Sequence, residues 1–328
     1  AVKWYRKAAE AGHVKAQYVL SDCYWKGIGV EENEEECFRW CHEAAQQGYV
    51  EAQFHLGNFY RDGNGVKANP RKAFSWLKKA SKQHHVEAKG NLGHCYQLGI
   101  GTKASSNKAK ECYVFAADGG STIAQYNLGI GYRDGIFGRR NKKRAFVWFE
   151  KAASKGDPNA QVAYAEMLRS GEVTKRRQPK KAVHYYKKAA RKGDSLAMYH
   201  LADCFENGDG AKRDQRQAFR WYLRSAEAGD IDAMYKVATC YEFGRLRTKK
   251  DLSKALQWYY EASESGHFIK SYPSHMTNIV KQIVSGYLAK GKTDEALELY
   301  RELEEDGHDV ASDIHKIKRK IASTHADN

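Results

Sequence analysis

Small and apolar residues recur along this chain with a period of 36 or 37 residues. Each period opens with a glycine or, in one case, a histidine. Four residues after every one of these opening positions but the last comes a small residue, and apolar residues come eight and twelve residues after the opening position. A spacing of i, i+4 and i+8 puts these side chains on one face of a helix. The opening positions are Gly12, Gly48, His84, Gly120, Gly156, Gly193, Gly229 and Gly266.

A second glycine column predicts where this first helix ends, because glycine readily takes the left-handed conformation of a helix C-cap. These glycines are Gly27, Gly63, Gly99, Gly135, Gly171, Gly208 and Gly244. After a loop, a column of capping residues four places before a small residue predicts the start of a second helix. The capping residues are Asn33, Asn69, Ser105, Asn141, Asp214 and Asp251, with Gln178 as the exception.

Each period is therefore predicted to be a helical hairpin that stacks on its neighbours to bury its apolar stripe. The expected fold is an all-α solenoid. Aromatic residues share one register of the second helix, and we interpret them as core packing rather than a platform for nucleic-acid bases. They are Trp4, Trp40, Trp76, Trp148, Tyr185, Trp221 and Trp258.

The stretches WYRKAAEAGHVKAQYVL, AQFHLGNFYRDGNGV and KAFSWLKKASK resemble Sel1-like repeats, whose signature is A-x-x-x-L-G-x-x-Y-x-x-G-x-G-V followed by K-A-x-x-W-Y-x-K-A-A-x-x-G. The resemblance implies a right-handed, tetratricopeptide-related superhelix of antiparallel helix pairs. It covers residues 1–270, as a partial first unit and about seven repeats.

Residues 271–328 depart from this pattern. A linker, HFIKSYPSHM, precedes a hairpin from Asn278 to Gly307 whose core, IVSGYLAKGKTDEALELYRELEEDG, resembles a tetratricopeptide or pentatricopeptide unit. A single unit of that kind cannot supply an array that reads RNA bases, so we interpret it as a terminal cap. A final helix from about Val310 to Ser323 is expected to close the end.

Composition favours a folded chain without a membrane span, since 42% of residues are hydrophobic and no run of about 18 apolar residues occurs. Seven cysteines without a CxxC pair, and no N-x-S/T sequon, favour a reducing, cytoplasmic compartment. The cysteine column is expected to be small buried residues: Cys23, Cys95, Cys204 and Cys240. Because Ala1 falls in the middle of a repeat, we expect the native N-terminus to be absent.

No catalytic, cofactor-binding or metal-binding motif is present in the sequence, and no enzyme activity is expected. The G-x-G elements are similar to phosphate-binding loops, but none follows a predicted strand. We interpret them as turns between helices. They are Gly27 with Gly29, Gly63 with Gly65, Gly99 with Gly101, and Gly208 with Gly210.

The loops between the two helices of each repeat carry nearly all of the net charge of +15. Their formal charges, in repeats one to seven, are −5, +3, +2, +5, +4, +1 and +4. Equivalent loops of a solenoid align, so a basic edge is predicted, opposed by the acidic loop Glu31, Glu32, Glu34, Glu35 and Glu36. The strongest members of the basic edge are Arg139, Arg140, Lys142, Lys143, Arg144, Lys175, Arg176, Arg177, Lys180, Lys181, Arg245, Arg247, Lys249 and Lys250. A lysine before the second helix is also usual in the family that the chain resembles, so this charge alone does not establish a contact surface.

A second candidate surface is the outward side of the first helices, which lines the concave face in related solenoids. Its residues vary from unit to unit, as a peptide groove would. They are Gln17, Asp22, His55, Asn58, Asn91, His94, Asn127, His200, Asp203 and Lys236.

Two functional hypotheses remain open. In the first, the chain is an adaptor that binds one or more proteins or peptides, with an acidic partner on the basic edge, as the Sel1-like resemblance implies. In the second, it binds RNA or belongs to a ribonucleoprotein assembly, with the basic edge on phosphates.

Overall fold

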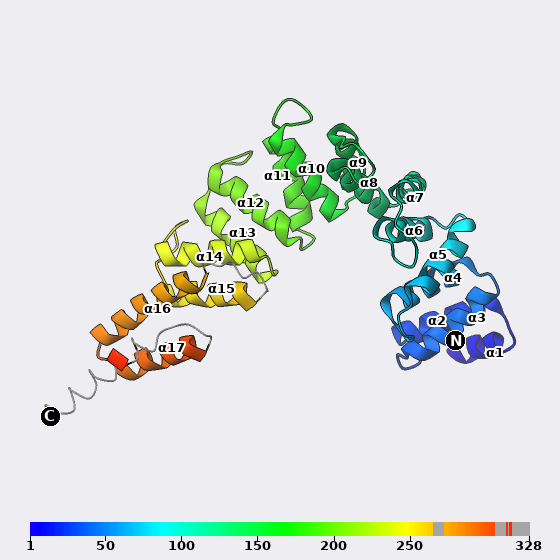
Figure 1. Ribbon diagram of the computed structural model, residues 1–328, viewed down its shortest axis with the longest axis horizontal. Coiled ribbons are helices and arrows are strands. Elements are labelled where there is room, and N and C mark those ends of the chain that lie inside the picture. Colours follow the sequence, from blue (N-terminus) through cyan, green and yellow to red (C-terminus); the bar gives the residue numbers. More distant parts are fainter. Residues whose placement is uncertain (265–271, 306–312, 314, 317–328) are drawn as a thin grey trace. The chain divides into compact units, whose positions relative to one another are not determined.

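The computed structural model describes residues 1–264, 272–305, 313, 315 and 316. Within these residues every regular element is an α-helix, and successive helices are paired (Figure 1). The helices form two compact units. The first contains residues 1–167 and 172–175, and the second contains residues 168–171 and those from 176 onward. The division therefore falls near the end of α10 (Pro158–Ser170) and in the loop after it.

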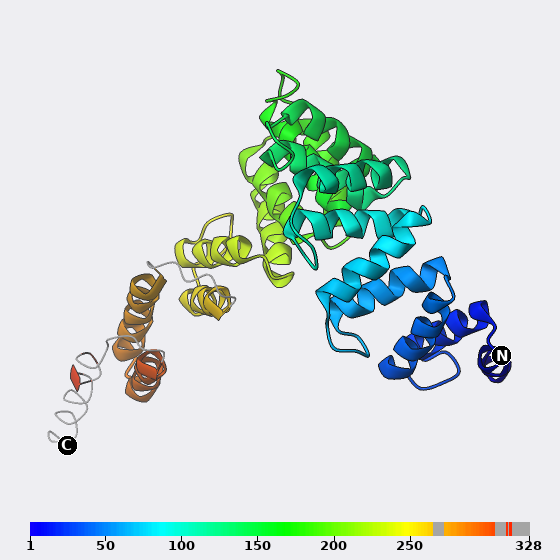
Figure 2. The same cartoon turned by 45° about the vertical axis from the view of Figure 1, so that its right-hand side comes forward.

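In the first unit, the helices from α1 to α9 pack against one another in chain order. Figure 2 shows the same pairing from a second direction. The helices are α1 (Val2–Glu10), α2 (Val14–Lys26), α3 (Glu34–Gln46), α4 (Val50–Asp62), α5 (Pro70–Lys82), α6 (Val86–Leu98), α7 (Ser106–Asp118), α8 (Thr122–Asp134), α9 (Lys142–Ser154) and most of α10 (Pro158–Ser170).

In the second unit, the helices from α11 to α17 likewise pack in chain order. They are α11 (Pro179–Ala190), α12 (Ser195–Asn207), α13 (Gln215–Glu227), α14 (Ile231–Phe243), α15 (Leu252–Glu264), α16 (Tyr272–Ala289) and α17 (Thr293–Glu305). The all-α fold of stacked helix pairs is confirmed. The expected linker is helical from Tyr272 onward, and most of the expected final helix lies outside the described residues.

The helix ends follow the capping chemistry that the sequence predicts. The side chains of Asn33, Asn69, Ser105 and Asn141 each accept a hydrogen bond from the backbone N–H three residues later, whereas Gln178 makes no such bond. Left-handed glycines end the first helices, as Gly27 does with φ of 66°. His84 replaces glycine in the turn between the second helix of one repeat and the first helix of the next. It also takes the left-handed conformation, with φ of 62°.

The second glycine of the G-x-G elements lies against the preceding repeat. A Cβ atom on Gly65 would come within 2.1 Å of the Glu34 carbonyl oxygen, and one on Gly101 within 2.0 Å of the Pro70 carbonyl oxygen. Only glycine permits so close an approach of two backbones. These elements are therefore packing points between repeats, in agreement with their interpretation as turns.

The most deeply buried side chains of the second helices lie one residue after the register of aromatic residues that includes Trp40 and Trp76, which we call the tryptophan register. The side chains there are fully buried: Cys41, Leu77, Tyr113, Phe149, Tyr186, Tyr222 and Tyr259. In the tryptophan register, only Trp40 is buried, while Trp4 is 74% exposed. Most of the others are half-buried beneath a cation from the following turn, as Lys79 lies 3.7 Å from the Trp76 ring centre. The interpretation of this register as core packing is confirmed for Trp40, and Trp76, Trp221 and Trp258 pack against the core while half-buried, whereas Trp4 is exposed.

Candidate functional site

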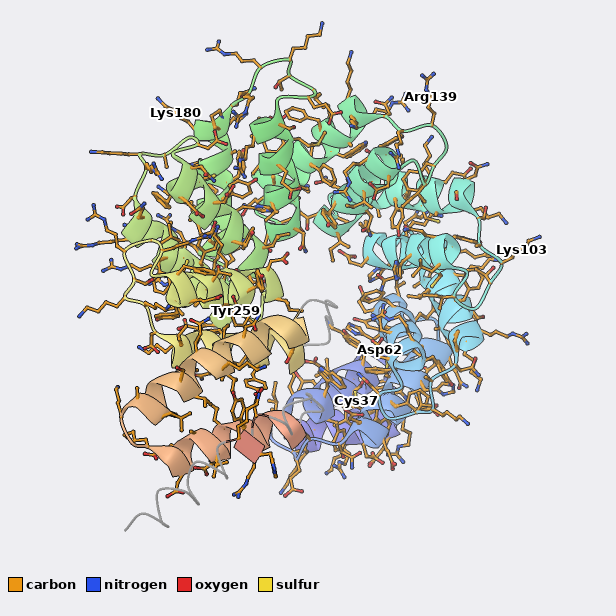
Figure 3. All side chains as sticks on the ribbon, turned by 60° about the vertical axis from the view of Figure 1, so that its left-hand side comes forward. Cys37, Asp62, Lys103, Arg139, Lys180 and Tyr259 are labelled. Carbon is orange, nitrogen blue, oxygen red and sulfur yellow. The ribbon has the colours of Figure 1, made fainter. Side chains whose placement is uncertain are left out.

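A pocket of about 370 Å³ opens on the first helices α2 and α4 in the first unit. We call it the α2–α4 pocket; its lining includes Tyr18, Asp22, Trp25, His55, Asn58 and Asp62. Three of these, Asp22, His55 and Asn58, belong to the predicted outward side of the first helices. Figure 3 labels Asp62 and, from the neighbouring α3, Cys37, which also lines the pocket.

Aromatic rings form the apolar part of the α2–α4 pocket. The indole of Trp25 is 41% exposed, and its centre lies 5.6 Å from the ring centre of Phe59. The ring centre of Tyr18 lies 5.8 Å from that of His55. An exposed aromatic residue held by a buried one is a typical anchor point in protein interfaces, because it offers apolar area at little entropic cost.

The charges of the pocket are balanced locally. Lys26 pairs with Asp22 at 2.8 Å, and Arg61 pairs with Asp62 at 2.7 Å. The guanidinium of Arg61 holds the pKa of the Asp62 carboxyl below its usual range. Burial lowers the pKa of His55 despite the nearby Asp22 carboxylate, so this imidazole is neutral at pH 7. The pocket therefore offers hydrogen-bonding groups without a large net charge.

The same face continues into α6, where the structure joins two predicted residues. Asn91 Nδ2 donates a hydrogen bond of 2.9 Å to Asn58 Oδ1. His94 is exposed on the same helix, and Asn127 is half-buried on α8. Predicted residues of neighbouring repeats thus share one face, at least from α4 to α6.

Gln17 is a correction to the predicted surface. Its side chain is only 5% exposed, and its Nε2 donates a hydrogen bond of 3.2 Å to the Ala9 carbonyl oxygen at the end of α1. Gln53 and Gln125 make the equivalent bond in later repeats. Gln17 therefore belongs to a buried register, two residues away from the register of His55, that ties repeats one, two, four and five to the units before them.

In the second unit, the predicted residues of the outward side are engaged in ion pairs and aromatic contacts. Asp203 on α12 pairs with Arg169, and Lys236 on α14 pairs with Glu206 at 3.0 Å. The ring centre of His200 lies 5.2 Å from that of Tyr186. Like Asp22 and His55 in the first unit, these side chains therefore already have contact partners within the chain.

Sequence reasoning missed the aromatic residues of this surface. The position one residue before the predicted register holds Tyr18, Phe54, Tyr126, Tyr199 and Tyr235, all of them half-buried or exposed. Their recurrence at the repeat period was a signal that could have identified them. Trp25 was not detectable in this way, because the equivalent residues of several later repeats are charged.

The predicted basic edge consists of exposed side chains throughout. In repeat four, Lys142 pairs with Glu172, the Arg140 Nε donates to the Asp134 carbonyl oxygen, and Arg144 lies 5.4 Å from the Tyr132 ring centre. Within the described residues, Arg139 and Lys143 have no ion-pair partner. The Arg139 side chain points away from the helices (Figure 3).

Other members of the basic edge differ in how far they are neutralised. Arg177 in repeat five pairs with Asp209 at 2.6 Å. Lys175 takes a left-handed backbone conformation with φ of 55°, and Lys180 extends away from the helices in Figure 3. In repeat seven, Arg247, Lys249 and Lys250 line a separate cavity. In the acidic loop, Glu34 accepts a hydrogen bond of 3.0 Å from the Gly65 N–H.

All seven cysteines are buried free thiols, which confirms the interpretation of the cysteine column as small buried residues. Burial raises the pKa of Cys204 and of Cys240 to about 11, so neither is a reactive thiolate at neutral pH. Among the described residues, no group of three or more His, Cys, Asp or Glu side chains could hold a metal ion. None of the described helices is long and apolar enough to cross a membrane.

Comparison with known families gives two matches. The Sel1 repeat model matches residues 1–13, 14–49, 50–85, 86–121, 122–157, 158–194, 195–230 and 231–267. The PPR repeat model matches residues 281–308. A search of curated proteins found no match. The predicted division at residue 270 follows this change of repeat type and stays a prediction, since the compact units divide elsewhere.

Two solved structures are similar over most of the chain. One is c5321 from uropathogenic Escherichia coli, a protective antigen with an SLR fold, with 28% identity and a TM-score of 0.69 over 93% of this chain. The chain spans 64% of the length of that protein. The other is a Sel1 repeat protein from Oxalobacter formigenes, with 26% identity and a TM-score of 0.67, covering 81% of this chain and 100% of that protein.

Proposed function

The chain belongs to the Sel1 repeat family, and from that premise we propose that it is a non-enzymatic adaptor that binds a protein partner through the α2–α4 pocket. Sel1 repeat proteins are generally protein-interaction scaffolds, and their solenoid fold is typically non-catalytic. The observation that carries the proposal is the exposed Trp25 beside the buried Phe59, in a cavity with paired charges.

The α2–α4 pocket suits a peptide segment of a partner protein. Its aromatic rings would pack against an apolar side chain, while Asn58 and the paired carboxylates offer hydrogen-bonding groups to a polypeptide backbone. The volume of about 370 Å³ lies within the range of small-ligand pockets and accommodates one or two side chains. The rest of the partner would lie along the neighbouring first helices.

We further propose that the partner is acidic where it meets the basic edge. Arg139 and Lys143 are exposed and have no ion-pair partner among the described residues, so an acidic surface would gain charge-assisted contacts there without breaking existing ones. Such contacts would mainly raise the association rate, because exposed charges act through long-range steering.

The test of the pocket is affinity capture followed by quantitative mass spectrometry. Trp25→Ala and Asn58→Ala are each expected to reduce partner recovery by at least about tenfold, which corresponds to a loss of about 1.4 kcal/mol in binding. The control is Val147→Ala, which removes an exposed apolar side chain from the second helix α9. Undiminished capture by both pocket variants, with circular dichroism unchanged, would rule out this site.

A separate test concerns the basic edge. Arg139→Gln combined with Lys143→Gln is expected to slow association with the captured partner and to reduce its salt dependence. The alternative function, RNA binding, predicts that the wild-type chain binds single-stranded RNA with an affinity that falls with a slope of about −0.7 per phosphate contacted against log salt. Such binding, abolished by the same two substitutions, would contradict the acidic-protein proposal.

A further inference from the structure

A second cavity, of about 500 Å³, lies in the second unit between α13 and the loop that leads into α15. We call it the α13–α15 pocket. Its cationic lining consists of Arg216, Arg220, Arg247, Lys249, Lys250 and Lys254. Arg216 and Arg220 come from repeat six, and the other four come from the loop and helix start of repeat seven, so adjacent repeats build the pocket together.

The positive charge of this pocket is largely unneutralised. Its one carboxylate, on Asp251, lies 3.7 Å from the Lys254 ammonium and also accepts a hydrogen bond from the Lys254 N–H at the start of α15. The other five cationic side chains have no ion-pair partner in the part of the chain that the structure describes. Cations gathered within a Debye length of about 8 Å repel one another, so a bound anion would relieve this repulsion.

An apolar wall lies beside these cations. Leu246 is buried at 8% exposure, and the rings of Phe219 and Tyr241 meet edge to face with centres 5.5 Å apart. Leu246 stands where repeats one, two, three and six have the second glycine of G-x-G, and it keeps the left-handed conformation with φ of 51°. The next residue, Arg247, has φ of 62°. Two successive non-glycine residues in this region indicate a backbone held in a strained conformation, a feature that often marks binding sites.

The charge is specific to this repeat and is not a property of the fold. An equivalent cavity of about 660 Å³ lies between α5 and the loop of repeat three in the first unit. Among its lining residues only Arg71 and Lys103 are cationic, and Gly101 stands in place of Leu246. The same location in the solenoid thus lacks both the cluster of cations and the apolar wall.

We propose that the α13–α15 pocket binds a phosphorylated side chain of a protein partner. Arginine matches the oxygen atoms of phosphate bidentately, and a phosphorylated residue brings close to two negative charges and three acceptor oxygens. Arg216, Arg220 and the lysines of repeat seven hold the phosphate, while Phe219 and Leu246 contact the carbon atoms that carry it. The inference rests on the proposed function in requiring that the partner be a protein.

The charge distribution favours a single phosphate over a polynucleotide. RNA presents phosphates in a row, and its binding sites carry cations along the path of the strand. In the second unit, the neighbouring loop of repeat six has a net charge of only +1, against +4 in repeat seven. The cations are concentrated in one pocket and do not continue into the next loop.

The test uses fluorescence anisotropy with the whole chain and short neutral peptides labelled with a dye. Peptides containing phosphoserine or phosphotyrosine are expected to bind at least about tenfold more tightly than the same peptides without phosphate, because only the phosphate forms charge-assisted hydrogen bonds with the arginines. Arg216→Gln combined with Arg220→Gln is expected to remove this preference. The matched control, Arg191→Gln combined with Lys212→Gln, removes the same charge from exposed positions of the same unit outside the pocket, and affinity should change less than about threefold.

Three results would overturn the inference: equal affinity for both kinds of peptide, an unchanged preference in the arginine variant, or RNA binding through these arginines without phosphopeptide binding. Lys249→Gln combined with Lys250→Gln provides a second pocket variant if the first fails to fold. Because the α2–α4 pocket lies in the other unit, the two proposals fail separately. Loss of capture in Trp25→Ala without phosphopeptide binding would reject only the phosphate site.

Discussion

The ring of Phe149 in α9 lies directly against Gly129 in α8, so a Cβ atom on this glycine would come within 2.4 Å of Phe149 Cε1. The same relationship joins Gly57 to Leu77 and Gly93 to Tyr113. In each of these repeats the glycine that follows Leu56, Leu92 or Leu128 lets the two helices of a hairpin close over a fully buried side chain.

Gly129→Ala is therefore expected to destabilise the protein by about 1 to 3 kcal/mol, because the added methyl group overpacks the hairpin. Gly90→Ala in α6 is the matched control, since its Cβ atom would lie 3.7 Å from Ala116 Cβ in ordinary contact. That substitution should be neutral or stabilise by up to about 1 kcal/mol through helix propensity. Urea unfolding followed by circular dichroism measures both, and equal effects would contradict the packing account.

Asn141→Ala is expected to destabilise the first unit by about 1 kcal/mol, because it removes the hydrogen bond of 3.0 Å to the Arg144 N–H at the start of α9. Gln178→Ala, at the equivalent position before α11, should cost much less, since Gln178 makes no side-chain cap. Thermal unfolding of the two variants tests this difference. A cost as large for Gln178→Ala would show that the cap bond is not the cause.

The thiols are expected to be almost unreactive in the folded protein. With the pKa of Cys204 and of Cys240 raised to about 11 by burial, about one thiol in a thousand at these positions would be ionised at pH 8. A chromogenic disulfide reagent should thus react slowly in buffer and with all seven cysteines in urea. Rapid reaction of several thiols without denaturant would contradict the buried placement.

Acid is expected to destabilise the first unit through His55. Burial lowers the pKa of this imidazole below its ordinary value of 6.5 in the folded chain, so as the pH falls below 6.5 the unfolded chain takes up the proton first. Through His55, the free energy of unfolding is therefore unaffected above pH 6.5 and declines below it. His55→Gln should show a smaller loss of unfolding midpoint between pH 7.5 and pH 5.5 than the wild type, and an identical loss would refute this role.

Much of the fold could be predicted from the sequence because its determinants are local. Glycine columns, capping residues such as Asn141, and the spacing of small residues act within one or two turns, and the structure confirms them. Which of two adjacent apolar side chains faces the core was harder to predict. Adjacent helix positions differ by 100°, so the register of Trp76 and the fully buried register of Leu77 are equally apolar in sequence but differ in exposure.

The candidate sites depend on contacts between repeats, which a single sequence does not display. Gln17 is polar, yet it is buried because the Ala9 carbonyl oxygen of the preceding helix needs a donor. Asp203 is neutralised by Arg169, more than thirty residues away. The loop charges of repeat seven were visible in the sequence, but their junction with Arg216 and Arg220 required the structure.

Hydroxyl-radical footprinting of the chain with its captured partner tests the proposed adaptor role most directly. Trp25 is 41% exposed in the free chain, and its oxidation is expected to fall several-fold in the complex as the partner covers the α2–α4 pocket. Trp4 on α1, 74% exposed and outside this pocket, should be oxidised equally with and without the partner. Unchanged oxidation of Trp25 in a complex that forms would contradict the proposal that this pocket binds the partner.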